Sequence, residues 1–179
     1  MNVIRSQIYP SPTGDLLLGD WRGELVLCDW LLSTNGYASD SRVSHHLQAV
    51  IQEAVTDLLC ETVAQLNAYF VGRLRTFDLP LYGAGTPFQQ SVWLALREIP
   101  YGVTRSYQDI AQAIGNPRGT RAVAGAIRHN PLSVIVPCHR VIGKNGQLTG
   151  YNGGTGALYI KERLLALEQR VAASAAPKN

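Results

Sequence analysis

The sequence predicts an α/β (α+β) protein in two parts. Residues 1–80 are expected to form a small N-terminal domain with an antiparallel sheet and helices, and residues 81–179 a mostly helical C-terminal domain with a helix-turn-helix. Three observations support this: alternating apolar runs and turns near the N-terminus, capped helical patterns after residue 86, and the Pro- and Gly-rich segment "RTFDLPLYGAGTPF" between them.

The first domain begins with strands and continues with helices. The stretch "GDLLLGDWRGELVLCDWLL" holds two apolar runs separated by residues 20–23, a pattern typical of a β-hairpin. Residues 43–55 and 60–72 show helical spacing of apolar residues, and Gly72 ends the second pattern.

Two capping boxes mark the first helices of the second domain. Thr86 with Gln89 starts one helix, which Pro100 stops. Ser106 with Asp109 starts the next, and its apolar face is followed by a glycine at residue 115.

A third helix, roughly residues 120–129, follows the turn "NPRG" and completes the helix-turn-helix pattern. One side of it is apolar, whereas the other carries small and basic residues: Arg121, Ala124, Gly125 and Arg128. The alternative is a plain pair of packing helices. The small residues favour a groove-binding helix because they let its backbone approach closely, and an arginine at each end can reach phosphates.

Charge is distributed unevenly along the chain. Residues 1–80 hold five arginines and nine acids, a balance of −4, whereas residues 81–179 hold eleven basic residues and four acids, a balance of +7. A solubilising surface would explain the excess, but its position in the helical half favours a polyanionic partner, nucleic acid first.

The chain has the features of a cytoplasmic protein. No basic segment followed by an apolar run begins the sequence, and no apolar run approaches the ~18–20 residues that span a membrane. The three cysteines, Cys28, Cys60 and Cys138, are an odd number without disulfide-like spacing. We therefore expect free thiols in a reducing compartment.

One cysteine stands in a reactive context. In "LSVIVPCHRVIGKNGQL", an expected strand at residues 132–136 leads through Pro137 to Cys138, His139 and Arg140. Nearby cations lower a thiol's pKa toward the reactive thiolate. In a regular strand, however, neighbouring side chains point to opposite faces, so Cys138 and His139 would touch only through a bend or a bridging water.

Two further expectations concern this region. Asn145–Gly146 predicts a hairpin that pairs residues 140–143 with 147–149. A carboxylate is needed to orient the histidine, and the spacing alone leaves four candidates in this half: Glu98, Asp109, Glu162 and Glu168.

Several motifs together resemble the O6-alkylguanine-DNA alkyltransferases. "PCHRV" resembles that family's active-site motif, and "GTPFQQSVWLALREIPYGVTRSYQDIAQAIGNP", "RAVAGAIRHNP" and "GYNGG" are similar to its other segments. The resemblance covers essentially residues 80–170. Between "YNGG" and "KERLLALE" the chain is longer than the usual family spacing, so Glu162 stays an alternative to Glu168.

The resemblance implies a role for each matching position. Cys138 would accept the alkyl group, His139 would be its water-linked base, Glu168 would orient that base, Asn130 would brace the active-site turn and Tyr107 would lie near the flipped base. DNA contacts are implied for Ser106, Thr120, Arg121, Ala122, Gly125 and Arg128, with Arg121 entering the base stack from the minor groove. The base pocket would comprise Tyr107, Val141, Tyr151, Asn152 and Gly153.

The implied activity is a single-turnover DNA repair reaction. The protein would flip O6-alkylguanine, chiefly O6-methylguanine, out of double-stranded DNA and move the alkyl group irreversibly to Cys138. The reaction needs no cofactor, because the protein itself is consumed. We also expect no metal, since Cys28 with His45 or His46 does not have the spacing of a zinc site. We expect a monomer with no obligate protein partner. The alternatives are a non-catalytic DNA-binding regulator or lesion sensor, and a cysteine hydrolase using Cys138 and His139.

Overall fold

A computed structural model describes residues 2–31, 38–151 and 157–175, and the chain divides into two compact units. The first comprises residues 1–86 together with residues 131–135, and the second comprises residues 87–130 and 136–179. The predicted boundary near residue 80 therefore moves to residue 86. The prediction also missed the return of residues 131–135 to the first unit, because that contact joins segments about a hundred residues apart.

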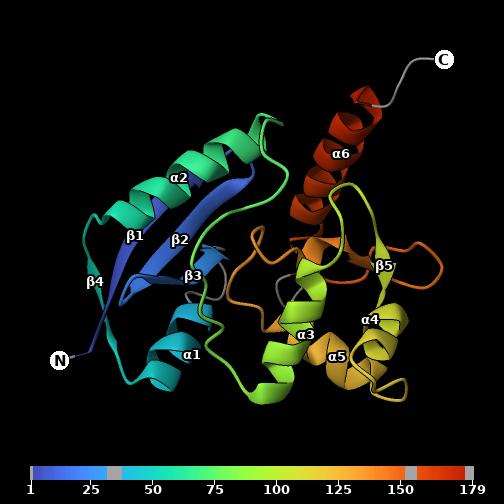
Figure 1. The fold of residues 1–179 in the computed structure, drawn as a ribbon, viewed down its shortest axis with the longest axis horizontal. Helices are drawn as coiled ribbons and strands as arrows, with labels where there is room; N and C mark the ends of the chain where they lie inside the picture. Colours follow the sequence, from blue (N-terminus) through green and yellow to red (C-terminus); the bar gives the residue numbers. More distant parts are fainter. Residues whose placement is uncertain (1, 32–37, 152–156, 176–179) are drawn as a thin grey trace. The chain divides into compact units, whose positions relative to one another are not determined.

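The first unit is built on a four-stranded sheet with the order β3-β2-β1-β4 (Figure 1). Strands β1 (Val3–Ser11), β2 (Gly14–Trp21) and β3 (Glu24–Trp30) pair in antiparallel fashion, as expected. The hairpin between β2 and β3 turns at Arg22 and Gly23, whose φ angles of 56° and 84° are those of a tight hairpin turn.

Strand β4 (Val50–Glu53) adds a parallel edge to this sheet, with Val3 opposite Val50. The sequence predicts one helix over residues 43–55, and this is wrong for its second half. The helix α1 (Ala38–Leu47) ends at Gln48, whose φ of 48° reverses the chain, and the β-branched pair Val50–Ile51 then enters the sheet.

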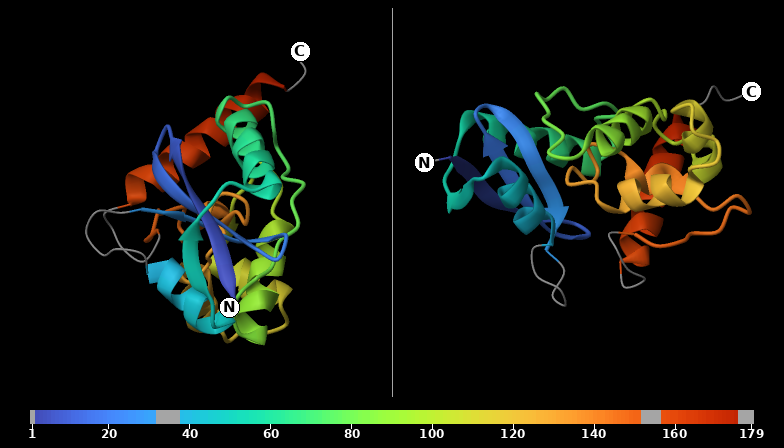
Figure 2. Two further views of the ribbon diagram at one scale, coloured as in Figure 1. Left: turned by 90° about the vertical axis from the view of Figure 1, so that its left-hand side faces the viewer. Right: turned by 90° about the horizontal axis from the view of Figure 1, so that it is seen from below.

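Helices cover both faces of the sheet (Figures 1 and 2). Ile4 of β1 packs in one cluster with Val43 and Leu47 of α1. Tyr9 of the same strand donates a hydrogen bond of 2.8 Å to Asn67 of α2 (Asp57–Phe70). Because positions 4 and 9 face opposite sides of a strand, α1 and α2 lie on opposite faces.

The second unit is mostly helical. It contains α3 (Pro87–Arg97), α4 (Tyr107–Ala113), α5 (Thr120–Arg128) and α6 (Leu158–Ser174), with a short pair of parallel strands, β5 (Arg105–Ser106) and β6 (Val141–Ile142). The capping box of Ser106 and Asp109 is formed as predicted, with both reciprocal hydrogen bonds. In the part of the chain that the structure describes, no helix has the length and apolar character to cross a membrane.

Two predictions around the cysteine motif are corrected. The predicted strand over residues 132–136 is not formed: Leu132 makes one isolated bridge, and residues 133–135 form a turn, because prolines flank the segment and Val134 has a φ of 72°, outside the β region. The predicted hairpin at residues 145–146 forms only a turn, in which the amide of Gly143 donates to the carbonyl of Gln147 at 2.8 Å. Strand β6 pairs with β5 and not with residues 147–149.

Candidate functional site

Cys138 begins a single turn of 3₁₀ helix, η1 (Cys138–Arg140). Its amide donates to the carbonyl of Val136 at 2.8 Å, and the amide of Arg140 donates to the carbonyl of Pro137 at 3.0 Å. Neighbours in such a helix lie a third of a turn apart. Cys138 and His139 therefore do not point to opposite faces, as they would in a strand.

The histidine and arginine after the thiol meet one carboxylate on α6. His139 Nε2 lies 2.7 Å from Oε1 of Glu168. Arg140 donates to both oxygens of Glu168, from Nε at 2.9 Å and from Nη2 at 3.0 Å, and its Nη1 donates to the carbonyl of Ile99 at 2.7 Å. The amide of Gly102 also donates to Glu168, at 3.2 Å. Of the four carboxylates that spacing allowed, Glu168 is the one that lies against His139, and Glu162 is exposed.

Burial and charge decide how these groups ionise. Burial alone would raise the pKa of Glu168, but the hydrogen bonds and charges of His139 and Arg140 outweigh it and hold that pKa well below its usual range. Burial lowers the pKa of His139. The charges of Arg140 and Lys161 lower this pKa further, whereas Glu168 raises it. The pair therefore rests at neutral pH as a carboxylate beside a neutral imidazole.

The tautomer of His139 follows from its partner. An ionised carboxylate only accepts hydrogen bonds, so Nε2 of His139 carries the proton that faces Glu168. Nδ1 then holds the lone pair. This atom is buried and has no hydrogen-bond partner among the residues that the structure describes. It is available to accept a proton directly or through a water.

Lys161 is a member of the site that the sequence prediction missed. It is 1% exposed on α6 and donates a hydrogen bond to the carbonyl of Gly150 at 3.4 Å. Burial lowers the pKa of Lys161 to about 8, although attraction to Cys138 opposes the change. The same attraction favours a thiolate at Cys138. Its position seven residues before Glu168, on the same helix face, is the signal that could have revealed it.

Asn130 encloses the turn that precedes the cysteine. It is 3% exposed, and its Nδ2 donates to the carbonyl of Val136 at 3.0 Å. The hydrogen bond joins the two ends of residues 131–135, so the side chain fixes the distance between the end of α5 and the cysteine turn.

Two of the expected base-pocket residues, Tyr107 and Val141, lie at or beside β6. Val141 is fully buried and pairs with Arg105 of β5, which places β6 beside the start of α4. Tyr107 donates to the carbonyl of Thr149 at 3.1 Å, and Tyr151 is buried. Asn152 and Gly153, the other two expected pocket residues, lie outside the described residues.

Helices α4 and α5 form the predicted helix-turn-helix. Thr120 donates from Oγ1 to Gln108 at 2.8 Å, and Gln108 donates to the carbonyl of Pro117 at 2.9 Å, so side chains fix the turn between the helices. Ser106 caps α4 with its hydroxyl, and is half-buried.

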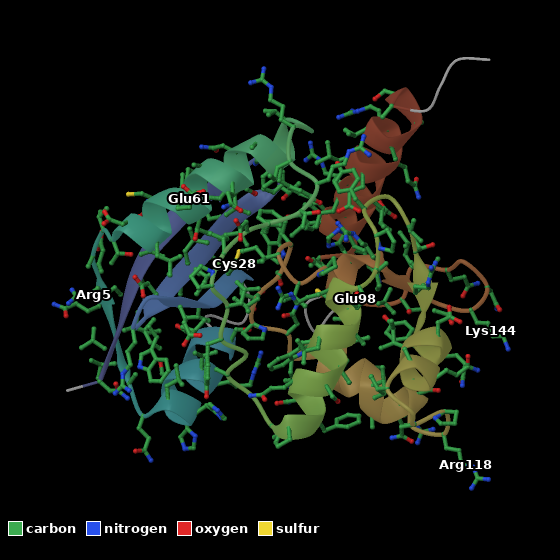
Figure 3. The ribbon with its side chains drawn as sticks, viewed as in Figure 1. Arg5, Cys28, Glu61, Glu98, Arg118 and Lys144 are labelled. Carbon is green, nitrogen blue, oxygen red and sulfur yellow. The ribbon has the colours of Figure 1, made fainter. Side chains whose placement is uncertain are left out.

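The outward face of α5 carries basic residues and small residues. Arg121, Ala122 and Arg128 are exposed there, while Val123, Ala126 and Ile127 are buried on the other side. A Cβ atom added at Gly125 would meet nothing within 4 Å, so packing within the protein does not require this glycine. Figure 3 shows Arg118 extending away from the ribbon at the turn before α5, and Lys144 at the loop after β6.

The described part of the chain contains no group of three His, Cys, Asp or Glu side chains that could bind a metal ion together. His45 and His46 lie in the last turn of α1, and Cys28 is buried in β3.

Comparisons with known proteins identify the family. A family model described as 6-O-methylguanine DNA methyltransferase, DNA binding domain, matches residues 87–170. A methylated-DNA–protein-cysteine methyltransferase from Methanosarcina acetivorans is 59% identical over 162 residues, 90% of this chain and 96% of that protein.

Solved structures agree with these sequence matches. The crystal structure of Mycobacterium tuberculosis O6-methylguanine methyltransferase matches with a TM-score of 0.79 and 42% identity, over 98% of this chain and 96% of that one. M. tuberculosis OGT in complex with DNA matches with a TM-score of 0.76 and 42% identity, over 94% of each chain. With the buried Cys-His-Arg turn and its carboxylate, these matches show that the chain belongs to the methylated-DNA–protein-cysteine methyltransferase family.

Proposed function

We propose that this protein repairs double-stranded DNA by transferring the methyl group of O6-methylguanine to the sulfur of Cys138. The observation that carries the proposal is the hydrogen bond of 2.7 Å between His139 Nε2 and Glu168. It leaves the basic Nδ1 of a buried, neutral imidazole next in the chain to a cysteine. Relatives that bear the methyltransferase name support the same activity.

The reaction begins with the thiol. Its proton passes to Nδ1 of His139, through a water if the two groups are not in contact, and the positive charge of Lys161 favours the thiolate that remains. Glu168 stabilises the imidazolium that forms, as a buried carboxylate does in other nucleophile–histidine pairs.

Transfer then breaks one bond and forms one. The thiolate attacks the methyl carbon, the carbon–oxygen bond at guanine O6 breaks, and its electron pair stays with guanine. Guanine takes up the proton released by the thiol. The hydroxyl of Tyr107, which donates to the carbonyl of Thr149 in the absence of DNA, turns to donate its hydrogen bond to the leaving base. The product is a thioether, which has no route back to a thiol under these conditions, so each molecule acts once.

Access to the methyl group requires the base to leave the helix. The reacting carbon lies inside the base stack, and Cys138 is only 7% exposed, so the nucleotide must be turned out toward the protein. We assign this to α5: Arg121 fills the gap in the base stack, while Ala122 and Gly125 allow the helix to approach the groove and Arg128 contacts phosphate. We assign Val141 and Tyr151 to the pocket for the flipped base, a role that the resemblance also implies for Asn152 and Gly153.

Mass spectrometry tests the proposal directly. The protein is incubated with a duplex carrying one O6-methylguanine, and intact and peptide masses are measured. We expect the Cys138 peptide to gain one methyl group, never more than one per molecule, and the DNA to return to guanine. Cys138→Ala should bind the duplex without any gain.

Other results would support the alternatives. Binding without a mass gain in the wild-type protein would mean a lesion sensor. Release of a small product with repeated turnover would mean a hydrolase. Gel filtration with and without the duplex tests whether the protein acts as a monomer.

A further inference from the structure

The segment just before the reactive cysteine is held by the sheet of the first unit. Residues 131–135 belong to that unit, although the residues on either side belong to the second. The amide of Cys28 on β3 donates to the carbonyl of Pro131 at 2.8 Å, and Cys28 forms a parallel bridge with Leu132 (Cys28 is labelled in Figure 3). The sheet thus holds a stretch of chain that ends three residues before Cys138.

A buried carboxylate reinforces this attachment. Asp29, next to Cys28 on β3, is 7% exposed and accepts a hydrogen bond of 2.9 Å from the hydroxyl of Ser133. The amide of Trp30 also donates to it at 2.9 Å, and the hydroxyl of Ser39 on α1 donates to its other oxygen. Burial raises the pKa of Asp29, while these hydrogen bonds act in the opposite direction. Ser133 is 2% exposed, so solvent could not replace Asp29 as the hydrogen-bond partner of its hydroxyl if Asp29 were removed.

The held segment contains an unfavourable backbone conformation. Val134 has a φ of 72° and is 1% exposed. A β-branched residue rarely adopts the left-handed region, and such conformations persist only where surrounding structure enforces them. On one side of Val134, Ser133 donates a hydrogen bond to Asp29. On the other side, the carbonyl of Val136 accepts a hydrogen bond from Asn130.

We infer that Asp29 and Ser133 are positioning residues for the alkyl-transfer reaction. Their hydrogen bond holds residues 131–135 in the strained conformation from which the chain enters the Cys138 turn. The first unit, which contains none of the expected catalytic side chains, thereby takes part in the reaction through the backbone. This inference rests on the proposed function of Cys138.

Two serine variants separate positioning from general stability. Ser133→Ala and Ser39→Ala each remove one buried hydroxyl that donates to Asp29, but only Ser133 lies in the segment that leads to Cys138. Three quantities are measured on the full chain: the rate of methyl transfer from an O6-methylguanine duplex at saturating DNA, the dissociation constant for that duplex, and the melting temperature. Hydrogen exchange of the peptide over residues 131–140 reports the segment itself.

Ser133→Ala should transfer methyl about tenfold more slowly at saturating DNA, because Asp29 would lose a hydrogen-bond donor at a buried position, where an unmade hydrogen bond is costly. Its dissociation constant should stay within about twofold of wild type, and its 131–140 peptide should exchange faster. Ser39→Ala should melt a few degrees lower, as Ser133→Ala does, yet keep its transfer rate within about twofold. The double variant Asp29→Ala/Ser133→Ala should be no slower than Asp29→Ala alone, since both changes remove one interaction.

The inference is overturned if Ser133→Ala transfers at the wild-type rate, or if both serine variants lose rate in step with their melting temperatures. Wild-type protein in the same assay separates this from failure of the proposed function. If wild-type Cys138 gains no methyl group, both proposals fall, whereas transfer by wild type with an unaffected Ser133→Ala removes only the positioning role.

Discussion

Replacing Glu168 by glutamine should destabilise the protein far more than the same replacement at Glu162, six residues earlier on α6. Glu168 is fully buried and faces Arg140, which is 6% exposed. A glutamine would offer one neutral oxygen where two charged oxygens now accept from Arg140, and its amide would point at a donor. Breaking a buried ion pair in this way costs about 3–5 kcal/mol. For a chain of this length, that corresponds to a melting temperature lower by roughly 6–20 °C.

The pH dependence of this difference has a definite sign. The pKa of Glu168 is lowered in the folded state, whereas a glutamate in the unfolded chain takes up a proton near pH 4.3, roughly its unperturbed value. The stability that Glu168 provides is therefore complete above about pH 5 and is lost progressively as the pH falls below about 4.3. The gap between wild type and Glu168→Gln should be constant near neutral pH and should narrow in acid.

Guanidinium unfolding followed by circular dichroism, at several pH values from about 7 down to about 3, measures these quantities. Glu162→Gln is the matched control, because Glu162 is exposed on the same helix and surface substitutions usually change stability by less than about 0.5 kcal/mol. If the unfolding free energies of Glu168→Gln and Glu162→Gln differed by less than about 1 kcal/mol at neutral pH, the stability of the protein would not depend on a charged carboxylate at Glu168.

Three further outcomes are expected. The pKa of Lys161, about 8 when folded, lies below the ~10.4 of an unfolded lysine, so the unfolding free energy of wild type should rise relative to that of Lys161→Met as the pH rises from about 8 to about 10. A difference between the two proteins that stays constant over this range would contradict the lowered pKa. Arg128→Ala should weaken DNA binding and reduce the slope of log affinity against log salt by about 0.9, whereas Arg5→Ala on β1 should leave titrations at several salt concentrations unchanged. Gly125→Ala should stabilise α5 by roughly 0.5–1 kcal/mol, because the added Cβ meets open space. Gly125→Leu should keep the melting temperature of wild type while it lowers the affinity for DNA. A lower melting temperature of either variant would contradict the open space at this position.

Local signals predicted much of the second unit. The capping box at Ser106, the apolar faces and the turn "NPRG" place α4 and α5 close to their observed bounds, because a helix is encoded by neighbours along the chain. The same reasoning failed for β4, since Val50 and Ile51 fit a helix face or a strand equally well. Their pairing with β1 joins residues almost fifty positions apart, which spacing cannot reveal.

The candidate site shows a similar division. Cys138 and His139 stand out because they follow one another, whereas spacing left four carboxylates open, and the resemblance was needed to favour Glu168. An apolar run before the cysteine looked like a strand, but two prolines and the left-handed Val134 turn it into a looped segment. Lys161 went unnoticed because burial, not sequence, distinguishes it from other lysines.

The path of residues 131–135 constrains how this protein can be divided or recombined. The chain passes from the first unit to the second at residue 87, returns for five residues and leaves again at residue 136. No single cut separates the units, and a gene fusion at residue 86 would carry a foreign sheet without the matching five-residue segment. An exchange of the first unit between relatives would need three junctions, so β3 and the residues before the active cysteine are expected to be inherited as a matched pair.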